Sequence, residues 1–214
     1  EDMISVAESY ENDIKEELIN NSKFQKWYSE LDVKDFKKTP KNGWKKWQNN
    51  VASITDSKRY LVNAAVLLKF KGNTKELEKL LFGKYLNEAL FRNIDIESYE
   101  KLGDFQGSAL LQSEGAIRKT VKILLDKAEL ENVSYLEVRC SPMNYTEEMN
   151  PSQVLQCILE ELEKNKPGMD KSLLLIASRH GDMNKISQSV ELMKSMANKG
   201  LFVKYFRGFD LAGN

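Results

Sequence analysis

The chain has 214 residues, enough for one large domain or two small ones, and 41% of them are hydrophobic. Its 32 basic and 32 acidic side chains cancel, so net charge gives no reason to expect a nucleic-acid or membrane-surface partner. No apolar run approaches the roughly 18–20 residues that span a bilayer. We therefore expect a cytoplasmic protein without a membrane partner, in which Cys140 and Cys157 are reduced thiols.

Residues 1–102 show the pattern of helices and connecting loops, with no convincing strand. Apolar side chains recur at three- and four-residue intervals over residues 4–19 and again over residues 60–70, which is typical of amphipathic helices. Gly72 follows the second stretch, at a position where glycine commonly ends a helix. We interpret residues 1–102 as a helical N-terminal or insertion subdomain.

Trp44 and Trp47 lie three residues apart and are flanked by Lys41, Lys45 and Lys46. One interpretation is a short helix that packs both tryptophans inward and exposes its lysines, and the other is a contact with nucleic acid. We favour the packed helix because the neighbouring segments are not net basic. Nucleic acid is therefore not an expected partner.

Residues 103–214 contain three apolar segments, with a helical pattern before each of them. Strands are expected over residues 133–139, 172–178 and 201–214, and helices over residues 113–131, 151–165 and 183–199. This alternation predicts an α/β fold with a parallel sheet, in which polar groups gather at the C-terminal edge of the strands.

Polar side chains stand at the end of each expected strand. Arg139 ends the first, Arg179 and His180 follow the second, and Asp210 lies near the end of the third, just before Gly213. A carboxylate near a backbone N–H that glycine leaves accessible suits a polar ring ligand. We favour Arg139 as a residue that neutralises carboxylates at this edge. His180 either transfers protons or orients a loop, and both interpretations stay open.

His180 is the only histidine of the chain, and this limits the metal chemistry. A hydrolytic zinc site usually has two or three histidine ligands, or histidine together with cysteine and carboxylates. The chain cannot assemble a His-rich site by itself. Neither Cys140 nor Cys157 has a histidine nearby in sequence, so a thiol nucleophile is unsupported. We assign no catalytic residue and no metal ligand.

Three motifs in this order, YLEVRCSP at residues 135–142, IASRH at 176–180 and GFDLAGN at 208–214, resemble the adenosine deaminase family of zinc amidohydrolases. The resemblance covers residues 103–214, about half of the chain. It implies that this half is part of a (β/α)8 TIM barrel, with about three of its strands and their helices. It also implies a hydrolase in which a zinc-activated water removes the amino group of an adenine-type base.

The resemblance assigns roles to individual residues. Gly213 matches a family glycine whose backbone N–H contacts a purine ring nitrogen, and Asp210 lies on the rim of the same pocket. Arg179 and His180 match an Arg-His pair that we interpret as support for the pocket. The first-strand His-x-His of the family is absent, and its later zinc histidine, catalytic residues and paired aspartates do not occur in the chain.

These departures predict an internal fragment of a longer, zinc-dependent deaminase-like protein. We expect this piece to bind a purine-type small molecule but no catalytic zinc, and to be inactive by itself. Its substrate class is a nucleoside, a nucleotide or an adenine in nucleic acid. The alternative is a non-catalytic deaminase-like binding or interaction module. Either way, the exposed barrel edges predict that the piece is poorly stable alone, associates with itself or a partner, or is locally rearranged.

Overall fold

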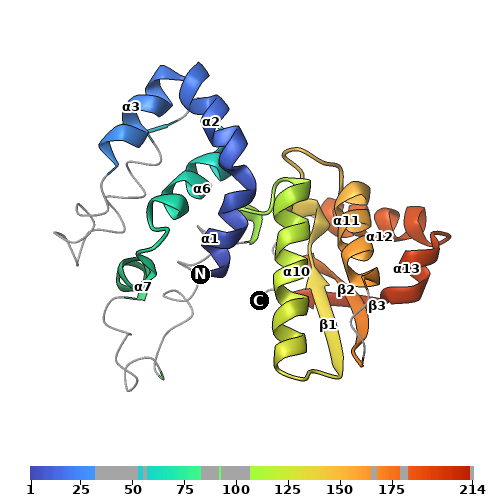
Figure 1. Cartoon of the computed structure of the whole chain (residues 1–214). Helices are drawn as coiled ribbons and strands as arrows, with labels where there is room; N and C mark the ends of the chain where they lie inside the picture. The colour runs from blue at the N-terminus through green and yellow to red at the C-terminus, as the bar shows by residue number, and fades with distance from the viewer. Residues whose placement is uncertain are drawn as a thin grey trace. The chain divides into compact units, whose positions relative to one another are not determined.

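The computed structural model describes residues 1–31, 53–54, 57–82, 92, 107–164, 168–178 and 183–212. The chain forms two compact units, Glu1–Leu111 and Gln112–Asn214 (Figure 1). The expected border between residues 102 and 103 lies outside the described residues. None of the described helices combines the length and the apolar composition of a membrane span.

The described elements of the first unit are all helical. Its elements are α1 (Asp2–Ala7), the 3-10 turn η1 (Glu8–Tyr10), α2 (Glu11–Asn20), α3 (Ser22–Glu30), α6 (Arg59–Lys69), α7 (Thr74–Phe82) and the 3-10 turn η4 (Gly107–Ala109). Helix α6 is the core element, because every residue from Tyr60 to Leu67 is buried. A helix that is apolar nearly all round has to be covered on all sides.

Two buried polar side chains of this unit hold the end of η4 and the residue that follows it. The hydroxyl of Tyr10 donates to the carbonyl of Leu110 at 2.5 Å, and the side-chain amide of Asn63 donates to the carbonyl of Ala109 at 3.0 Å. The rings of Tyr10 and Tyr60 pack with their centroids 5.2 Å apart. Segments distant in the sequence thus share one small core.

The second unit is an α/β structure with a parallel sheet. Its elements are α10 (Glu114–Leu130), β1 (Tyr135–Cys140), the 3-10 turn η5 (Pro142–Asn144), α11 (Pro151–Glu163), β2 (Asp170–Ser178), α12 (Met183–Met196), α13 (Gly200–Tyr205) and β3 (Phe206–Ala212). The strands pair in the order β1-β2-β3, and both pairings are parallel. This confirms the predicted fold class and is consistent with part of a (β/α)8 barrel.

Local sequence signals fix the starts of α10 and α11. Ser113 caps α10, because its hydroxyl accepts a hydrogen bond from the backbone N–H of Ala116 at 3.3 Å. Asn150 and Gln153 form a reciprocal capping box at the start of α11, with Pro151 in the first helical turn. Both devices satisfy backbone donors that a helix start leaves unpaired.

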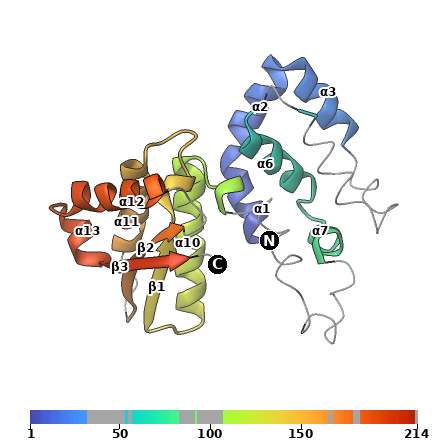
Figure 2. The same ribbon diagram turned by 180° about the vertical axis from the view of Figure 1, so that it is seen from behind.

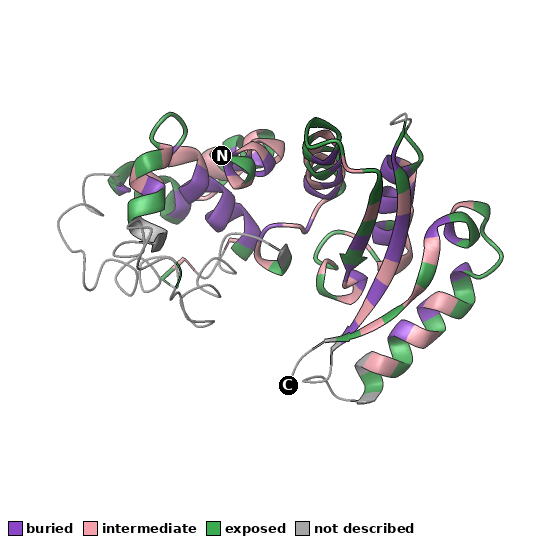
Figure 3. Cartoon of the chain, turned by 90° about the horizontal axis from the view of Figure 1, so that it is seen from below, coloured by how far each residue is buried: buried purple, intermediate pink, exposed green. Residues whose placement is uncertain are grey.

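The two faces of the sheet differ in burial. Val138 and Cys140 of β1 and Leu173, Leu175 and Ala177 of β2 alternate along their strands and are buried. They form the face that packs on the helices. Figure 3 shows how much of β2, the central strand, is buried. The opposite face carries the side chains of the candidate site.

The last expected strand is shorter than its sequence pattern indicates. Residues 200–205 form helix α13, and β3 begins only at Phe206. Phe202 and Tyr205 are buried on one side of this helix, and the Tyr205 hydroxyl donates to Glu163 at 2.6 Å. Composition alone does not distinguish a short buried helix from a strand in an aromatic run, whereas the spacing of these two residues fits a helix.

Candidate functional site

The candidate site lies at the C-terminal edge of the sheet, where parallel strands deliver their last residues to the same side. Arg139 stands one residue before the end of β1, and Asp210 stands two residues before the end of β3. These strands flank β2, as Figure 2 shows from behind. The Nη2 atom of Arg139 forms an ion pair with the Oδ2 atom of Asp210 across the middle strand.

The strand register explains how these two side chains meet. Arg139 is paired with Leu174 of β2, which is paired in turn with Gly208 of β3. Asp210, paired with Ile176, is two residues farther along β3 and therefore projects from the same face as Arg139. The long arginine side chain spans β2, and the ion pair lies over the apolar side chains of the middle strand.

The burial of the two partners differs. The Arg139 side chain is 52% exposed and that of Asp210 is 27% exposed. The Oδ2 atom of Asp210 itself is buried and has no hydrogen-bond partner among the described residues. Its charged neighbour is the guanidinium of Arg139. Charge compensation by the guanidinium lowers the cost of burying this oxygen.

A second polar group lies on the same face, nearer the start of the strands. The Tyr135 hydroxyl contacts the Ser172 hydroxyl at 2.8 Å and donates to the Glu137 carboxylate at 3.3 Å. Tyr135, Glu137 and Arg139 alternate along β1, so one face of this strand is polar over its whole length. This side of the sheet is suited to a polar ligand.

A separate hollow of about 680 Å³ lies at the opposite end of the sheet. It is lined by residues at the starts of the strands, including Tyr135, Asp170 and Arg207. Of its other charged side chains, Lys204 and Glu163 are hydrogen bonded to one another at 2.7 Å. Barrel enzymes place their chemistry at the other end of the strands, so we do not assign this hollow to the site.

Neither cysteine provides a nucleophile. Cys140 and Cys157 are buried free thiols. Burial raises the pKa of the Cys140 thiol to about 12, and burial also raises the pKa of Cys157. The thiolate is the reactive form, so both groups are inert near neutral pH.

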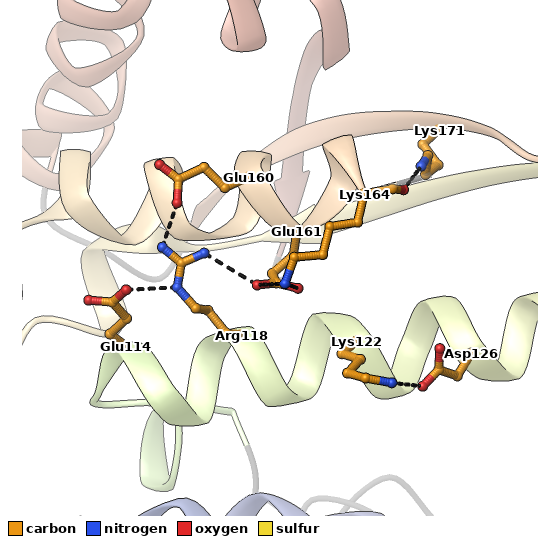
Figure 4. A network of polar contacts seen from close by, with 8 residues as sticks. All are labelled: Glu114, Arg118, Lys122, Asp126, Glu160, Glu161, Lys164 and Lys171. Carbon is orange, nitrogen blue, oxygen red and sulfur yellow. Dashed lines mark hydrogen bonds and ion pairs between the residues drawn. The ribbon is translucent and has the colours of Figure 1, made fainter. Parts of the chain in front are cut away.

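An ion-pair network holds the two helices that accompany β1 (Figure 4). Arg118 of α10 contacts Glu114 at 2.7 Å on its own helix, and Glu160 at 2.5 Å and Glu161 at 3.3 Å on α11. Glu161 is only 2% exposed and also pairs with Lys164 at 2.6 Å. The carboxylates raise the pKa of Arg118, and Arg118 lowers the pKa of Glu160. The network joins α10 to α11 and does not belong to the candidate site.

Several residues predicted from the sequence lie outside the described residues. These are Arg179, His180 and Gly213 of the predicted site, together with Trp44 and Trp47. The structure therefore brings together two of the predicted site residues, Arg139 and Asp210. Over the part of the chain that the structure describes, no three His, Cys, Asp or Glu side chains are grouped in a way that could hold a metal ion.

The sequence analysis did not single out Gln112, which contacts the loop after β1. Its side-chain amide donates to the carbonyl of Asn144 at 2.9 Å, and its side-chain oxygen accepts from the backbone N–H of Glu147 at 3.1 Å. The partners are 32 and 35 residues away. The sequence offered one weak signal, a glutamine directly before the helix cap Ser113.

A parallel sheet flanked by helices, with polar side chains at its C-terminal edge, is consistent with part of a (β/α)8 barrel. No family model matches the chain. The adenosine deaminase of Clostridium acetobutylicum is 29% identical over 108 residues, which cover 49% of this chain and 30% of that protein. The adenosine deaminase of Enterococcus faecalis is 28% identical over 123 residues, 56% of this chain and 35% of that protein.

An adenosine deaminase of Clostridium perfringens strain SM101 is 26% identical over 107 residues, 49% of this chain and 32% of that protein. The chain thus spans about a third of the length of the curated relatives it matches. These matches show a distant, partial relationship between the chain and the adenosine deaminases.

Proposed function

We propose that this chain contributes the purine-binding edge of an adenosine deaminase-like hydrolase, which removes the amino group of an adenine-type base. The observation that carries the proposal is the Arg139–Asp210 ion pair at the C-terminal edge of three parallel strands. The distant matches to adenosine deaminases support the same assignment. The substrate class is a nucleoside, a nucleotide or an adenine in nucleic acid.

Each residue of the proposed site has a distinct role. Asp210 accepts a hydrogen bond from a polar N–H or O–H group of the ligand, and Arg139 compensates the charge of this partly buried carboxylate. Gly213 follows three residues later and donates its backbone N–H to a purine ring nitrogen. Arg179 and His180 directly follow β2 in sequence, and in this proposal they support the purine pocket without contacting the ligand.

Zinc belongs to the complete deaminase-like protein of this proposal. When bound in such an enzyme, zinc supplies an activated water for attack on the carbon that carries the amino group. The described residues contain no group of metal ligands, so we derive no step through zinc from this chain. In the proposal, this chain by itself binds the purine and releases no ammonia.

A second candidate is a non-catalytic deaminase-like module that binds a purine or a protein partner. The described residues hold no group of metal ligands, so both candidates rest on the same binding edge and differ only in turnover. In the first case a complete protein that includes this chain releases ammonia from adenosine in a zinc-dependent manner. In the second case it binds the purine without turnover.

Calorimetric titration of the chain with adenosine and with cytidine tests the purine assignment. We expect measurable binding of adenosine and none of cytidine at the same concentrations, because the proposed contacts require a purine ring. Equal binding of both nucleosides, or of neither, would contradict the proposal. Metal analysis of the purified chain independently tests the expectation that this chain binds no catalytic zinc. Stoichiometric zinc would refute that expectation.

A further inference from the structure

The segment between β1 and α11 is a long loop at the edge that carries the candidate site. It comprises residues 141–150 and is longer than the roughly two to six residues usual for a connection from strand to helix. It begins directly after β1, so it lies at the C-terminal edge of the sheet, as do the ends of β2 and β3. Long loops at this edge commonly build the walls of binding sites.

Gln112 is placed to hold this loop. It precedes Ser113, the cap of α10, and α10 runs back to the start of β1 through a tight turn at Asn132, whose φ is 56°. The beginning of α10 therefore lies at the end toward which β1 points, as Figure 1 shows. Gln112 is 5% exposed, although its neighbours in the loop, Asn144 and Glu147, are exposed.

Both the donor and the acceptor of the Gln112 side-chain amide form hydrogen bonds to the loop. The amide donates to the carbonyl of Asn144 at 2.9 Å, and the oxygen accepts from the backbone N–H of Glu147 at 3.1 Å. These two backbone groups come from different parts of the loop, so the side chain fixes their separation. The loop is also fixed at its far end by the capping box of Asn150 and Gln153. The buried side chain of Gln112 thus satisfies one backbone acceptor at the end of η5 and one backbone donor in the segment before α11.

We propose that Gln112 is a positioning residue for the purine site, acting through the loop of residues 141–150. This inference rests on the proposed function, because it takes the loop to be one wall of that site. Gln112 does not touch the ligand. It holds the wall in the conformation that receives the ligand, so that binding does not have to order the loop.

Three variants of the full 214-residue chain test this role. Gln112→Met keeps the length of the side chain and removes both hydrogen bonds. Gln112→Glu keeps the acceptor for the N–H of Glu147 and, when ionised, loses the donor to Asn144. Gln156→Met is the matched control, because the side-chain amide of Gln156 donates to Glu160 on its own helix at 2.8 Å and lies outside the loop of residues 141–150.

Amide hydrogen exchange measures the loop directly. We expect exchange at Glu147 and in the peptide of residues 141–150 to accelerate about tenfold in Gln112→Met and less in Gln112→Glu. Exchange in α11 should stay at the rate of the unchanged chain, as it should in Gln156→Met. Unchanged loop exchange in Gln112→Met would overturn the inference, and so would equal acceleration throughout the unit.

Titration with adenosine measures the consequence for the site. We expect the affinity to fall about tenfold in Gln112→Met, to fall less in Gln112→Glu and to stay unchanged in Gln156→Met. A faster loop with undiminished adenosine affinity would refute the positioning role while leaving the proposed function intact. If the unchanged chain binds no adenosine, the proposed function fails, and the exchange experiment still decides whether Gln112 holds the loop.

Discussion

Arg139 and Asp210 form an ion pair across β2, although they lie on strands that are not neighbours in the sheet. The pair links the two outer strands on the polar face. Because the side chains are partly exposed, solvent screens their attraction, and we expect Arg139→Gln to cost about 1 kcal/mol of unfolding free energy.

A double-mutant cycle with Arg139→Gln and Asp210→Asn, followed by urea unfolding, measures this coupling. We expect a coupling energy of about 1 kcal/mol, because each single substitution already breaks the same pair. Strictly additive effects of the two substitutions would show that the pair contributes nothing to the fold.

Arg118 is expected to matter more for stability than any other surface arginine of the second unit that the structure describes. Arg118→Met leaves the carboxylate of Glu161, which is 2% exposed, with one cationic partner fewer, and we expect a loss of about 2–3 kcal/mol. Lys122→Met is the control, since it breaks an exposed pair with Asp126 and should cost at most about 0.5 kcal/mol. Equal effects of the two substitutions in urea unfolding would contradict this assignment.

The same ion-pair network should affect how the stability of the chain changes at acidic pH. Arg118 and Gln156 lower the pKa of Glu160 below its ordinary value of 4.5. A carboxylate whose pKa is lower in the folded state stabilises the fold above pH 4.5, and this contribution disappears as the pH falls through the lowered pKa. The stability lost between pH 5 and pH 3 should therefore be smaller in Arg118→Met than in the unchanged chain. A steeper acid dependence in the variant would contradict this account.

The two thiols are expected to be unreactive in the folded chain. Burial raises the pKa of Cys140 to about 12, so alkylation by iodoacetamide at pH 7.5 should be at least about 100-fold slower than in urea. Cys157 should also be protected, because it is buried as well. Mass spectrometry of alkylated peptides distinguishes the two sites, and rapid modification of Cys140 in the native chain would be inconsistent with the structure.

Self-association is expected through the edge strands of the sheet, β1 and β3. Within the described residues, β1 and β3 each pair with β2 only, and Phe209 and Leu211 of β3 are 40% and 50% exposed. An apolar strand with a free edge is prone to pair with another chain. Light scattering should show association that rises with concentration and weakens in Leu211→Lys. Ile19→Lys, which changes an exposed apolar residue of the first unit, is the control. A strict monomer at high concentration would contradict the prediction.

The sequence predicts the fold well where apolar patterns are long. The centres of all three strands and of α10, α11 and α12 agree with the structure, because helix periodicity and buried runs are local signals. Helix α13 was missed, since residues 201–205 have the composition of a strand, whereas in the structure they form a helix that buries Phe202 and Tyr205. Tertiary packing decides such short segments.

The sequence predicted single residues of the candidate site but not the contacts between them. Arg139 and Asp210 were identified as polar groups at strand ends, but their pairing depends on the strand order and on the reach of arginine across β2. Gln112 gave no comparable signal, because its role arises from backbone groups more than 30 residues away. Neither contact follows from local sequence.

The most direct test of the purine site is a titration of adenosine into Asp210→Asn and, as a control, Asp126→Asn. Asp126 pairs with Lys122 on the surface of α10 and has no role in the site. We predict that Asp210→Asn weakens adenosine binding at least about tenfold, because a charged acceptor is lost, and that Asp126→Asn binds like the unchanged chain. Unaltered affinity of Asp210→Asn for adenosine would contradict the assignment of this edge as the purine site.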